Sequence, residues 1–518
     1  MNHLAAIELP SIAYSALSPI LIMLAAACIG VLVEAFAPRA ARFPSQVGLS
    51  VVAIFAALIA IFAERSTHTL TLGRAIAIDA PALLSMAALL VFGLLATMLY
   101  ADRSLDKVGN NRVSHFVAEA ALPVGSRADR ALLASQRVQT EVFPLSLFAI
   151  AGMMIFVASN NLIVMFIALE VFSLPLYLIA GLNRRRRLLS QEAAVKYFLL
   201  GSFGSGFFIY GIALIYGYAG SVDLRDIFSE TTNNFGQDPL MLIGLGLLLV
   251  GLFFKAGIAP FHQWTPDVYQ GSPTPIAGFM SAATKLAAFV ALLRVLYIGY
   301  TAVPTQWQPV LAAFAIVSML VGGLFGIAQT DLKRMLAYSS IAHAGFILVA
   351  VLANTESGVS AVMFYIITYG LSSIAAFACV SLVRRQDGES SRLSDWKGMG
   401  RRKPLLAGIM TILMLSMTGI PLTAGFIGKF QAFSAAIEAD YAWLVVVALL
   451  LSAVTAVFYL RLIVLMYFHA PEEDVALIEE PGTSTDVVIW VTTALTVLFG
   501  VFPGPLLDLV AKATQFVG

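Results

Sequence analysis

The chain has 518 residues, of which 59% are hydrophobic and 12% charged, and its net charge is +1. Soluble domains have about 25% charged residues, so this composition excludes a soluble domain and indicates an integral membrane protein. The near-neutral charge argues against a nucleic acid partner. Two cysteines are too few for a disulfide scaffold or for an iron–sulfur cluster held by four thiolates.

Long apolar runs without strand-like alternation predict an all-α integral membrane protein and not a β-barrel. A helix needs about 20 apolar residues to cross a bilayer, and by that measure the chain holds about fourteen spans. We place them at residues 16–37, 47–63, 80–101, 143–158, 162–181, 193–218, 239–260, 274–300, 309–328, 333–353, 358–383, 404–420, 443–467 and 487–510. The sequence then divides into three N-terminal helices (1–101), a polar loop (102–141), two five-helix units (142–301 and 302–470), and a last loop and helix (471–518).

Basic residues are distributed unevenly between the loops. Loops after odd-numbered spans carry most of the arginines and lysines, including four consecutive arginines at 184–187, whereas loops after even-numbered spans are neutral or acidic. The positive-inside rule therefore predicts that the odd loops, with the polar loop 102–141 among them, are cytoplasmic and that both termini lie outside. We expect the four arginines to act as a topology signal that also meets lipid head groups.

Glycine and proline interrupt two of the spans. The seventh reads KAGIAP from Lys255 to Pro260, and the twelfth contains Gly419 and Pro421, followed by Lys429. A shift of five spans reverses the direction of the chain, so the two five-helix units are predicted to be inverted repeats, with Lys429 matching Lys255. Broken helices at matching places in inverted repeats are typical of an ion site.

Four charged residues fall near the middle of apolar spans: Glu170, Lys255, Lys285 and Lys429. Each costs roughly 2.5–3.5 kcal/mol to insert into a membrane, which favours a functional role. We interpret them as a proton relay in which Glu170 pairs with Lys255, Lys285 is the central link and Lys429 lies near an exit. The alternatives are a static ion pair, a packing charge at Lys285, and snorkelling of Lys255 or Lys429 to the surface.

Two histidines are candidates for bridging these charges, because an imidazole can pass a proton through either ring nitrogen. His343 lies in the tenth span, close to Ser339 and Ser340, and His262 lies beside the first break. A purely structural hydrogen bond is the alternative for both.

Four stretches resemble the subunit N family of NADH-quinone oxidoreductase, respiratory complex I. They are KAGIAPFHQWTPDVYQGSPTPIAGFMSAATK, FIALEVFSLPLYLIAG, QTDLKRMLAYSSIAHAGF and TGIPLTAGFIGKF. The resemblance implies fourteen transmembrane helices with two inverted five-helix repeats and broken seventh and twelfth helices. It also implies that Glu170, Lys255, Lys285 and Lys429 match the family's charged residues in helices five, seven, eight and twelve.

The sequence therefore predicts a proton-translocating membrane subunit of a type I NADH dehydrogenase, a translocase, in a bacterial inner membrane. The resemblance implies that this chain holds no cofactor, and that FMN, iron–sulfur clusters and quinone belong to other subunits. It implies as partners the K-, M-, J- and A-like membrane subunits and membrane lipids. The alternatives are a subunit of a Mrp-type cation/proton antiporter, which would not purify with NADH-oxidising subunits, and a passive scaffold.

Overall fold

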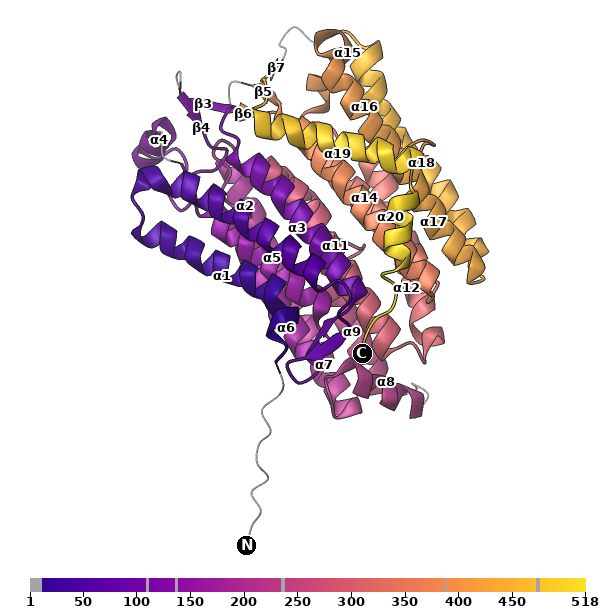
Figure 1. Ribbon diagram of the computed structural model, residues 1–518. Helices are drawn as coiled ribbons and strands as arrows, with labels where there is room; N and C mark the ends of the chain where they lie inside the picture. Colours follow the sequence, from indigo (N-terminus) through magenta and orange to yellow (C-terminus); the bar gives the residue numbers. More distant parts are fainter. Residues whose placement is uncertain (1–11, 109–110, 136–137, 234–237, 386–387, 472–475) are drawn as a thin grey trace.

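The computed structural model describes residues 12–108, 111–135, 138–233, 238–385, 388–471 and 476–518. Within these ranges, twelve helices are long and apolar enough to cross a membrane. Two shorter apolar helices, Val142–Ala158 and Pro404–Thr418, bring the spans to fourteen. The predicted all-α membrane fold is therefore confirmed, with short strands added at the two ends of the bundle (Figure 1).

The helices that make up the spans follow the chain as a bundle. They are α1 (Tyr14–Phe36), α2 (Arg39–Ala63), α3 (Ala80–Ala101), α5 (Val142–Ala158), α6 (Leu162–Ala180), α7 (Arg187–Ala219), α9 (Pro239–Ala256), α11 (Thr274–Arg294), α12 (Pro304–Ile327), α13 (Leu332–Val351), α14 (Glu356–Ser381), α16 (Pro404–Thr418), α18 (Ala442–Phe468) and α19 (Thr483–Val501). The other helices are α4 (Arg127–Ala134), α8 (Leu224–Asn233), α10 (Trp264–Gly271), α15 (Met399–Arg402), α17 (Ala424–Glu438) and α20 (Gly504–Ala511). A π-helical turn, η1 (Val295–Gly299), continues α11, and η2 (Leu393–Trp396) is a 3-10 turn.

The strands form three small antiparallel sheets outside the spans. β1 (Thr69–Thr71) pairs with β2 (Ile76–Ile78), and β3 (Asp106–Val108) pairs with β4 (Asn111–Val113). In the third sheet, β5 (Val383–Arg385) lies between β6 (Gly388–Glu389) and β7 (Leu477–Ile478). Helices in the spans and strands outside them agree with the physics of a bilayer, where a helix satisfies its own backbone hydrogen bonds.

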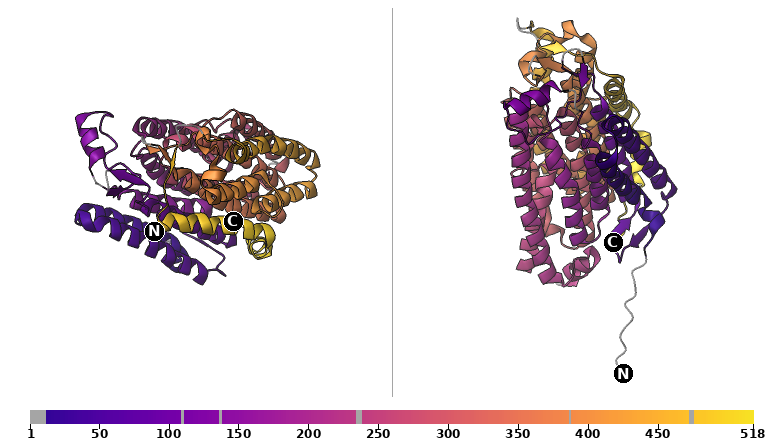
Figure 2. Two further views of the ribbon diagram at one scale, coloured as in Figure 1. Left: turned by 90° about the horizontal axis from the view of Figure 1, so that it is seen from above. Right: turned by 90° about the vertical axis from the view of Figure 1, so that its left-hand side faces the viewer.

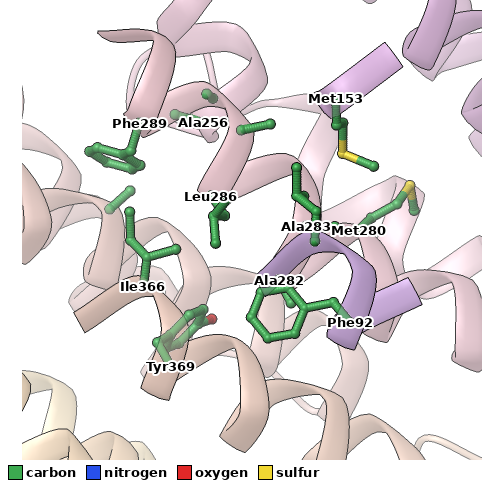
Figure 3. Close-up of a cluster of buried hydrophobic side chains, with 14 of the residues drawn as sticks. Phe92, Met153, Ala256, Met280, Ala282, Ala283, Leu286, Phe289, Ile366 and Tyr369 are labelled. Carbon is green, nitrogen blue, oxygen red and sulfur yellow. The ribbon is translucent and has the colours of Figure 1, made fainter. Parts of the chain in front are cut away.

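The centre of the bundle is formed by α11, α13 and α14, which are buried along nearly their whole length. Figure 3 shows the apolar packing around α11, with Phe92 from α3, Met153 from α5 and Tyr369 from α14 against it. Helices at the rim, such as α1, α2 and α18, expose apolar side chains. The chain therefore places Lys285 of α11 and His343 of α13 in its interior.

The two five-helix units pack in the same order. In the first, α5 packs on α6, and α7 packs on both halves of the broken span, α9 and α10; in the second, α12 packs on α13, and α14 packs on both halves, α16 and α17. The broken span α9–α10 runs toward the end of the bundle that carries β3 to β7, whereas α16–α17 starts at that end and runs away from it (Figure 1). This opposite direction is what inverted repeats require.

Several predicted boundaries are wrong in detail; the second span, for example, begins at Arg39 and not at Val47. The seventh span ends at Ala256 and not at Pro260, and the twelfth ends at Thr418 and not at Ile420, because a glycine with positive φ follows each helix. The fourteenth span divides into α19 and α20, since Pro503 lacks the N–H needed to continue the helix.

The polar loop 102–141 is folded onto the bundle. It contributes the β3–β4 hairpin and α4, and two of the four arginines at 184–187 hold it in place. Arg187 forms a buried ion pair with Asp129, and Arg184 donates to the carbonyls of Leu133 and Ser135 at 2.9 and 2.7 Å. For Arg184 and Arg187, the expected contact with lipid head groups is therefore wrong.

The two ends of the bundle differ in charge. The end that carries α4, α15 and β3 to β7, here called the basic end, holds the arginine-rich loops (Figure 1). At the opposite end, the Ala13 amide donates to Thr71 Oγ1 at 2.9 Å, and Arg225 donates to the carbonyl of Gly518 at 3.0 Å. Figure 2 shows that α1, α2 and α19 lie along one long side of the molecule.

Candidate functional site

Both broken spans end in the same backbone motif. Gly257 has φ +71° and Gly419 has φ +89°, the left-handed region that only glycine adopts easily. The next residue donates back into the helix in each case: Ile258 to the Phe253 carbonyl at 2.9 Å, and Ile420 to the Leu415 carbonyl at 3.0 Å. This Schellman motif ends a helix while leaving the carbonyl of its last residue available to another donor.

A buried lysine donates to that last carbonyl at both breaks. Lys285 Nζ lies 2.9 Å from the carbonyl oxygen of Ala256 and 2.9 Å from that of Ser340. Lys429 Nζ lies 2.8 Å from the carbonyl oxygen of Thr418. The negative end of a helix dipole favours a cation at this position.

The contacts thus match Lys429 with Lys285, which differs from the predicted match with Lys255. The second bond of Lys429 is to Ser452 Oγ of α18, at 2.8 Å. Both lysines are almost fully buried, with 2% of Lys285 and 5% of Lys429 exposed. Lys255 is likewise only 2% exposed, so snorkelling to the surface, the alternative raised for Lys255 and Lys429, is excluded for both.

Lys255 lies in the last turn of α9 inside an aromatic cage, the rings of Phe172, Tyr177, Tyr197 and Phe254. Its Nζ is 5.0 to 5.7 Å from the four ring centroids and 3.1 Å from the Tyr177 hydroxyl. Cations bind favourably over aromatic faces, more so when water is excluded. Aromatic rings and one hydroxyl therefore surround Lys255 on the side of the α9 break.

Glu170 does not contact Lys255 directly. Among the described residues no ion pair joins the two; Ser205 Oγ donates to Glu170 Oε1 at 2.5 Å instead. Glu170 and Tyr177 are seven residues apart on α6, two helical turns along the same face. Tyr177 thus occupies the contact position at Lys255 that the sequence analysis gave to Glu170.

His343 is the centre of a buried hydroxyl network between Lys285 and Lys429. Its Nδ1 lies 2.9 Å from the Tyr365 hydroxyl and its Nε2 lies 3.1 Å from the Tyr459 hydroxyl. The Tyr459 hydroxyl also lies 2.5 Å from Ser339 Oγ.

The two ends of this network reach the lysines through their neighbours. Ser339 is adjacent to Ser340, whose carbonyl accepts from Lys285. Tyr365 packs against Gly428, the residue before Lys429, and the Phe346 ring lies 4.5 Å from Lys429 Nζ. The network therefore lies between the two broken spans, and among the described residues no hydrogen bond joins its hydroxyls or His343 directly to Lys285 or Lys429.

The second candidate histidine, His262, lies beside the first break but apart from this network. Its ring is half-buried and its nearest aromatic neighbour is Tyr338, with 6.4 Å between ring centroids. Its Nδ1 is buried and has no hydrogen-bond partner among the described residues. A relay role for His262 remains a prediction.

A buried ion pair at the basic end was missed by the sequence analysis, which placed residue 333 at the start of the tenth span and gave it no partner. Lys333 Nζ donates to the carbonyl of Ser272 at 2.7 Å and to Glu389 Oε1 at 3.2 Å. Glu389 also accepts from the hydroxyl of Thr274. Burial alone would raise the pKa of Glu389, but Lys333, the Thr274 hydroxyl and nearby arginines outweigh it and lower the pKa to about 2. This anion ties β6 to the turn between α10 and α11.

Buried lysines at two broken, oppositely directed helices define the class of antiporter-like membrane subunits. Residues 159–455, more than half of the chain, match the family described as NADH:quinone oxidoreductase/Mrp antiporter, transmembrane. NADH-quinone oxidoreductase subunit N of Saccharopolyspora erythraea is 53% identical over 508 residues, which cover 97% of this chain and 98% of that protein. The chain belongs to the NADH-quinone oxidoreductase subunit N family.

Solved structures agree with this assignment. A chain of respiratory complex I from Thermus thermophilus is 33% identical with a TM-score of 0.76, covering 95% of this chain and 99% of that one. A chain of the Mrp complex from Dietzia sp. has a TM-score of 0.81 over 97% of both chains, but it is 18% identical and so shows the shared fold alone. The Mrp-type alternative thus has in its favour the shared family description and a similar fold, whereas the relatives of high identity are subunit N proteins.

Proposed function

We propose that this antiporter-like subunit of a proton-pumping NADH:quinone oxidoreductase moves protons through Glu170, Lys255, Lys285 and Lys429. One observation carries the proposal: both broken spans present their last carbonyl to a buried lysine. Carbonyls and hydroxyls hold these lysines, with no carboxylate on Lys285 or Lys429 among the described residues. Such a lysine can release its proton without leaving an unpaired anion behind, as a relay requires and a static ion pair does not.

His343 supplies the step between Lys285 and Lys429. A neutral imidazole accepts a proton at its unprotonated nitrogen and then releases the proton that its second nitrogen already carried. The Tyr365 hydroxyl contacts its Nδ1 and the Tyr459 hydroxyl contacts its Nε2, so the path continues from both ring nitrogens. We propose the order Lys285, Ser339, Tyr459, His343, Tyr365, Lys429.

The charge change that starts the relay acts on Glu170 and reaches Lys255. Glu170 makes no direct contact with Lys255, but it lies two turns before Tyr177 on α6, and the Tyr177 hydroxyl is 3.1 Å from Lys255 Nζ. A neighbouring subunit that alters the charge near Glu170 therefore changes the energy of the proton on Lys255. Because Lys255 precedes Ala256, whose carbonyl holds Lys285, this change is transmitted to the next lysine along the path.

The basic end is proposed to face the cytoplasm of a bacterium, with both termini on the outer side of the inner membrane. The uneven charge of the two ends supports this orientation. Electron transfer through FMN, iron–sulfur clusters and quinone is assigned to other subunits. K- and M-like subunits are the proposed neighbours in the membrane, with J- and A-like subunits further along and lipids around the apolar rim.

Glu170→Gln tests the proposal in membrane vesicles that contain the assembled complex. We expect NADH-driven quinone reduction and proton uptake to fall together by about tenfold or more, the scale of a lost proton-transfer group. Glu192→Gln is the matched control, because Glu192 is a surface carboxylate on α7 paired with Lys196 and should leave both rates unchanged. Normal pumping by every Glu170→Gln complex that assembles would support the scaffold alternative instead.

A further inference from the structure

A groove of about 510 Å³ opens at the basic end between the start of α7, α10 and the start of α13. Arg185, Arg186 and Arg392 line it, together with Asp331 and the leucines at 188 and 189. Its volume lies within the range of about 300–1,000 Å³ that is typical of small-molecule sites. The proton relay described above uses none of these residues.

The charges around the groove leave an excess of positive charge. The carboxylate of Asp331 already accepts hydrogen bonds from Gln270 and Ser391, and it caps α13 through the Arg334 amide. The Arg187 guanidinium is directed toward the polar loop 102–141, where it pairs with Asp129. The lining thus holds one carboxylate and, besides Arg187, three arginines. Arg186 also donates to Ser391 Oγ at 3.0 Å and lies near Glu389, so the groove attracts an anion through its surplus of arginines over carboxylates.

The polar part of the groove adjoins an apolar surface. Leu188 and Leu189 are 68% and 41% exposed, at the level where α7 enters the apolar bundle. Arginine binds phosphate through paired hydrogen bonds, and exposed leucines are suited to hydrocarbon chains. A single amphiphilic ligand would satisfy both parts.

We propose that this groove binds the phosphate head group of an anionic phospholipid, with its acyl chains along Leu188 and Leu189. The assignment deepens the lipid contact proposed above and rests on the membrane placement given there. It also sharpens the role of the arginines at 184–187. Arg184 and Arg187 hold the polar loop 102–141, while Arg185 and Arg186 line the groove.

The test uses the purified, delipidated complex and native mass spectrometry with added phosphatidylglycerol. Arg186→Gln with Arg392→Gln should bind the lipid at this site about tenfold more weakly than the wild type, since charge-assisted bonds to phosphate are among the strongest. Arg392→Gln alone, at an exposed position, should show a smaller loss and guards against misfolding of the double variant. Arg401→Gln, an exposed arginine of α15 at the same end, is the control and should bind as the wild type does.

Three outcomes of the binding measurement would overturn the assignment. They are equal lipid binding by the double variant, equal binding of zwitterionic phosphatidylcholine, and full competition by inorganic phosphate, which would indicate a site for the bare anion. A photo-crosslink from position 392 to a neighbouring subunit in place of lipid would also overturn it. Lipid binding and pumping are separate measurements. Unchanged lipid binding in the double variant would refute this assignment alone, whereas unchanged pumping in Glu170→Gln would refute the relay alone.

Discussion

Replacing Gly419 by alanine is expected to release Lys429 from the break in the twelfth span. Alanine is strained in the left-handed backbone conformation that Gly419 adopts, whereas glycine is not. The Cβ of alanine would also lie 2.9 Å from Lys429 Cδ. The backbone strain alone is about 1–2 kcal/mol. The side chain can relieve the contact only by moving, which takes Nζ away from the Thr418 carbonyl that it now meets at 2.8 Å.

A strain of one to two kcal/mol shifts an equilibrium by a factor of roughly 5–30. We therefore expect NADH-driven proton uptake in vesicles to fall by that order, with the complex still assembled. Gly408→Ala is the matched control: Gly408 lies in α16 of the same span, and no atom is within 4 Å of an added Cβ. Unchanged proton uptake in Gly419→Ala would refute the role given to the Thr418 carbonyl.

Two further predictions follow from the buried network and from the ion pair at the basic end. Tyr459→Phe removes the hydroxyl that joins Ser339 to His343 and should lower proton uptake several-fold. The control Tyr467→Phe, near the end of α18, should leave proton uptake unchanged. Equal proton uptake by the two variants would exclude the hydroxyl path. The Glu389 carboxyl has its pKa lowered from 4.5 to about 2, so its contribution to stability is complete above pH 4.5 and is lost as the pH falls toward 2. Hydrogen exchange of the β5–β6 hairpin in the purified complex should rise within that window, and Glu389→Gln should abolish the rise; a rise above pH 5 would contradict the assignment.

The sequence was sufficient to predict the fold because its signals are local. Length and hydropathy set the spans, and glycine with proline marked both broken helices. The hydrogen-bond partner of each buried lysine was not predictable, since it depends on contacts between segments that are far apart in the sequence. Lys285 meets the Ser340 carbonyl, 55 residues away, and Lys333 meets Glu389, 56 residues away.

The same reasoning explains what was wrong about the charged residues. Glu170 and Lys255 were paired because both are charged and buried in apolar spans, but helix rotation decides which side chains meet, and it brings Tyr177 to Lys255 instead. Tyrosines in apolar spans resemble packing residues in sequence, so neither Tyr177 nor Tyr459 stood out. Residue type therefore identified the lysines and His343, while the hydroxyl groups between them required the three-dimensional arrangement.

Lys285→Ala in membrane vesicles tests the central claim most directly, with NADH-driven quinone reduction and proton uptake recorded side by side. Lys285 contacts both the end of the first broken span, through the carbonyl of Ala256, and the residue next to Ser339 of the His343 network, through the carbonyl of Ser340. The account predicts that both rates fall together while the amount of assembled complex is unchanged. Two unchanged rates in the assembled variant would contradict the relay.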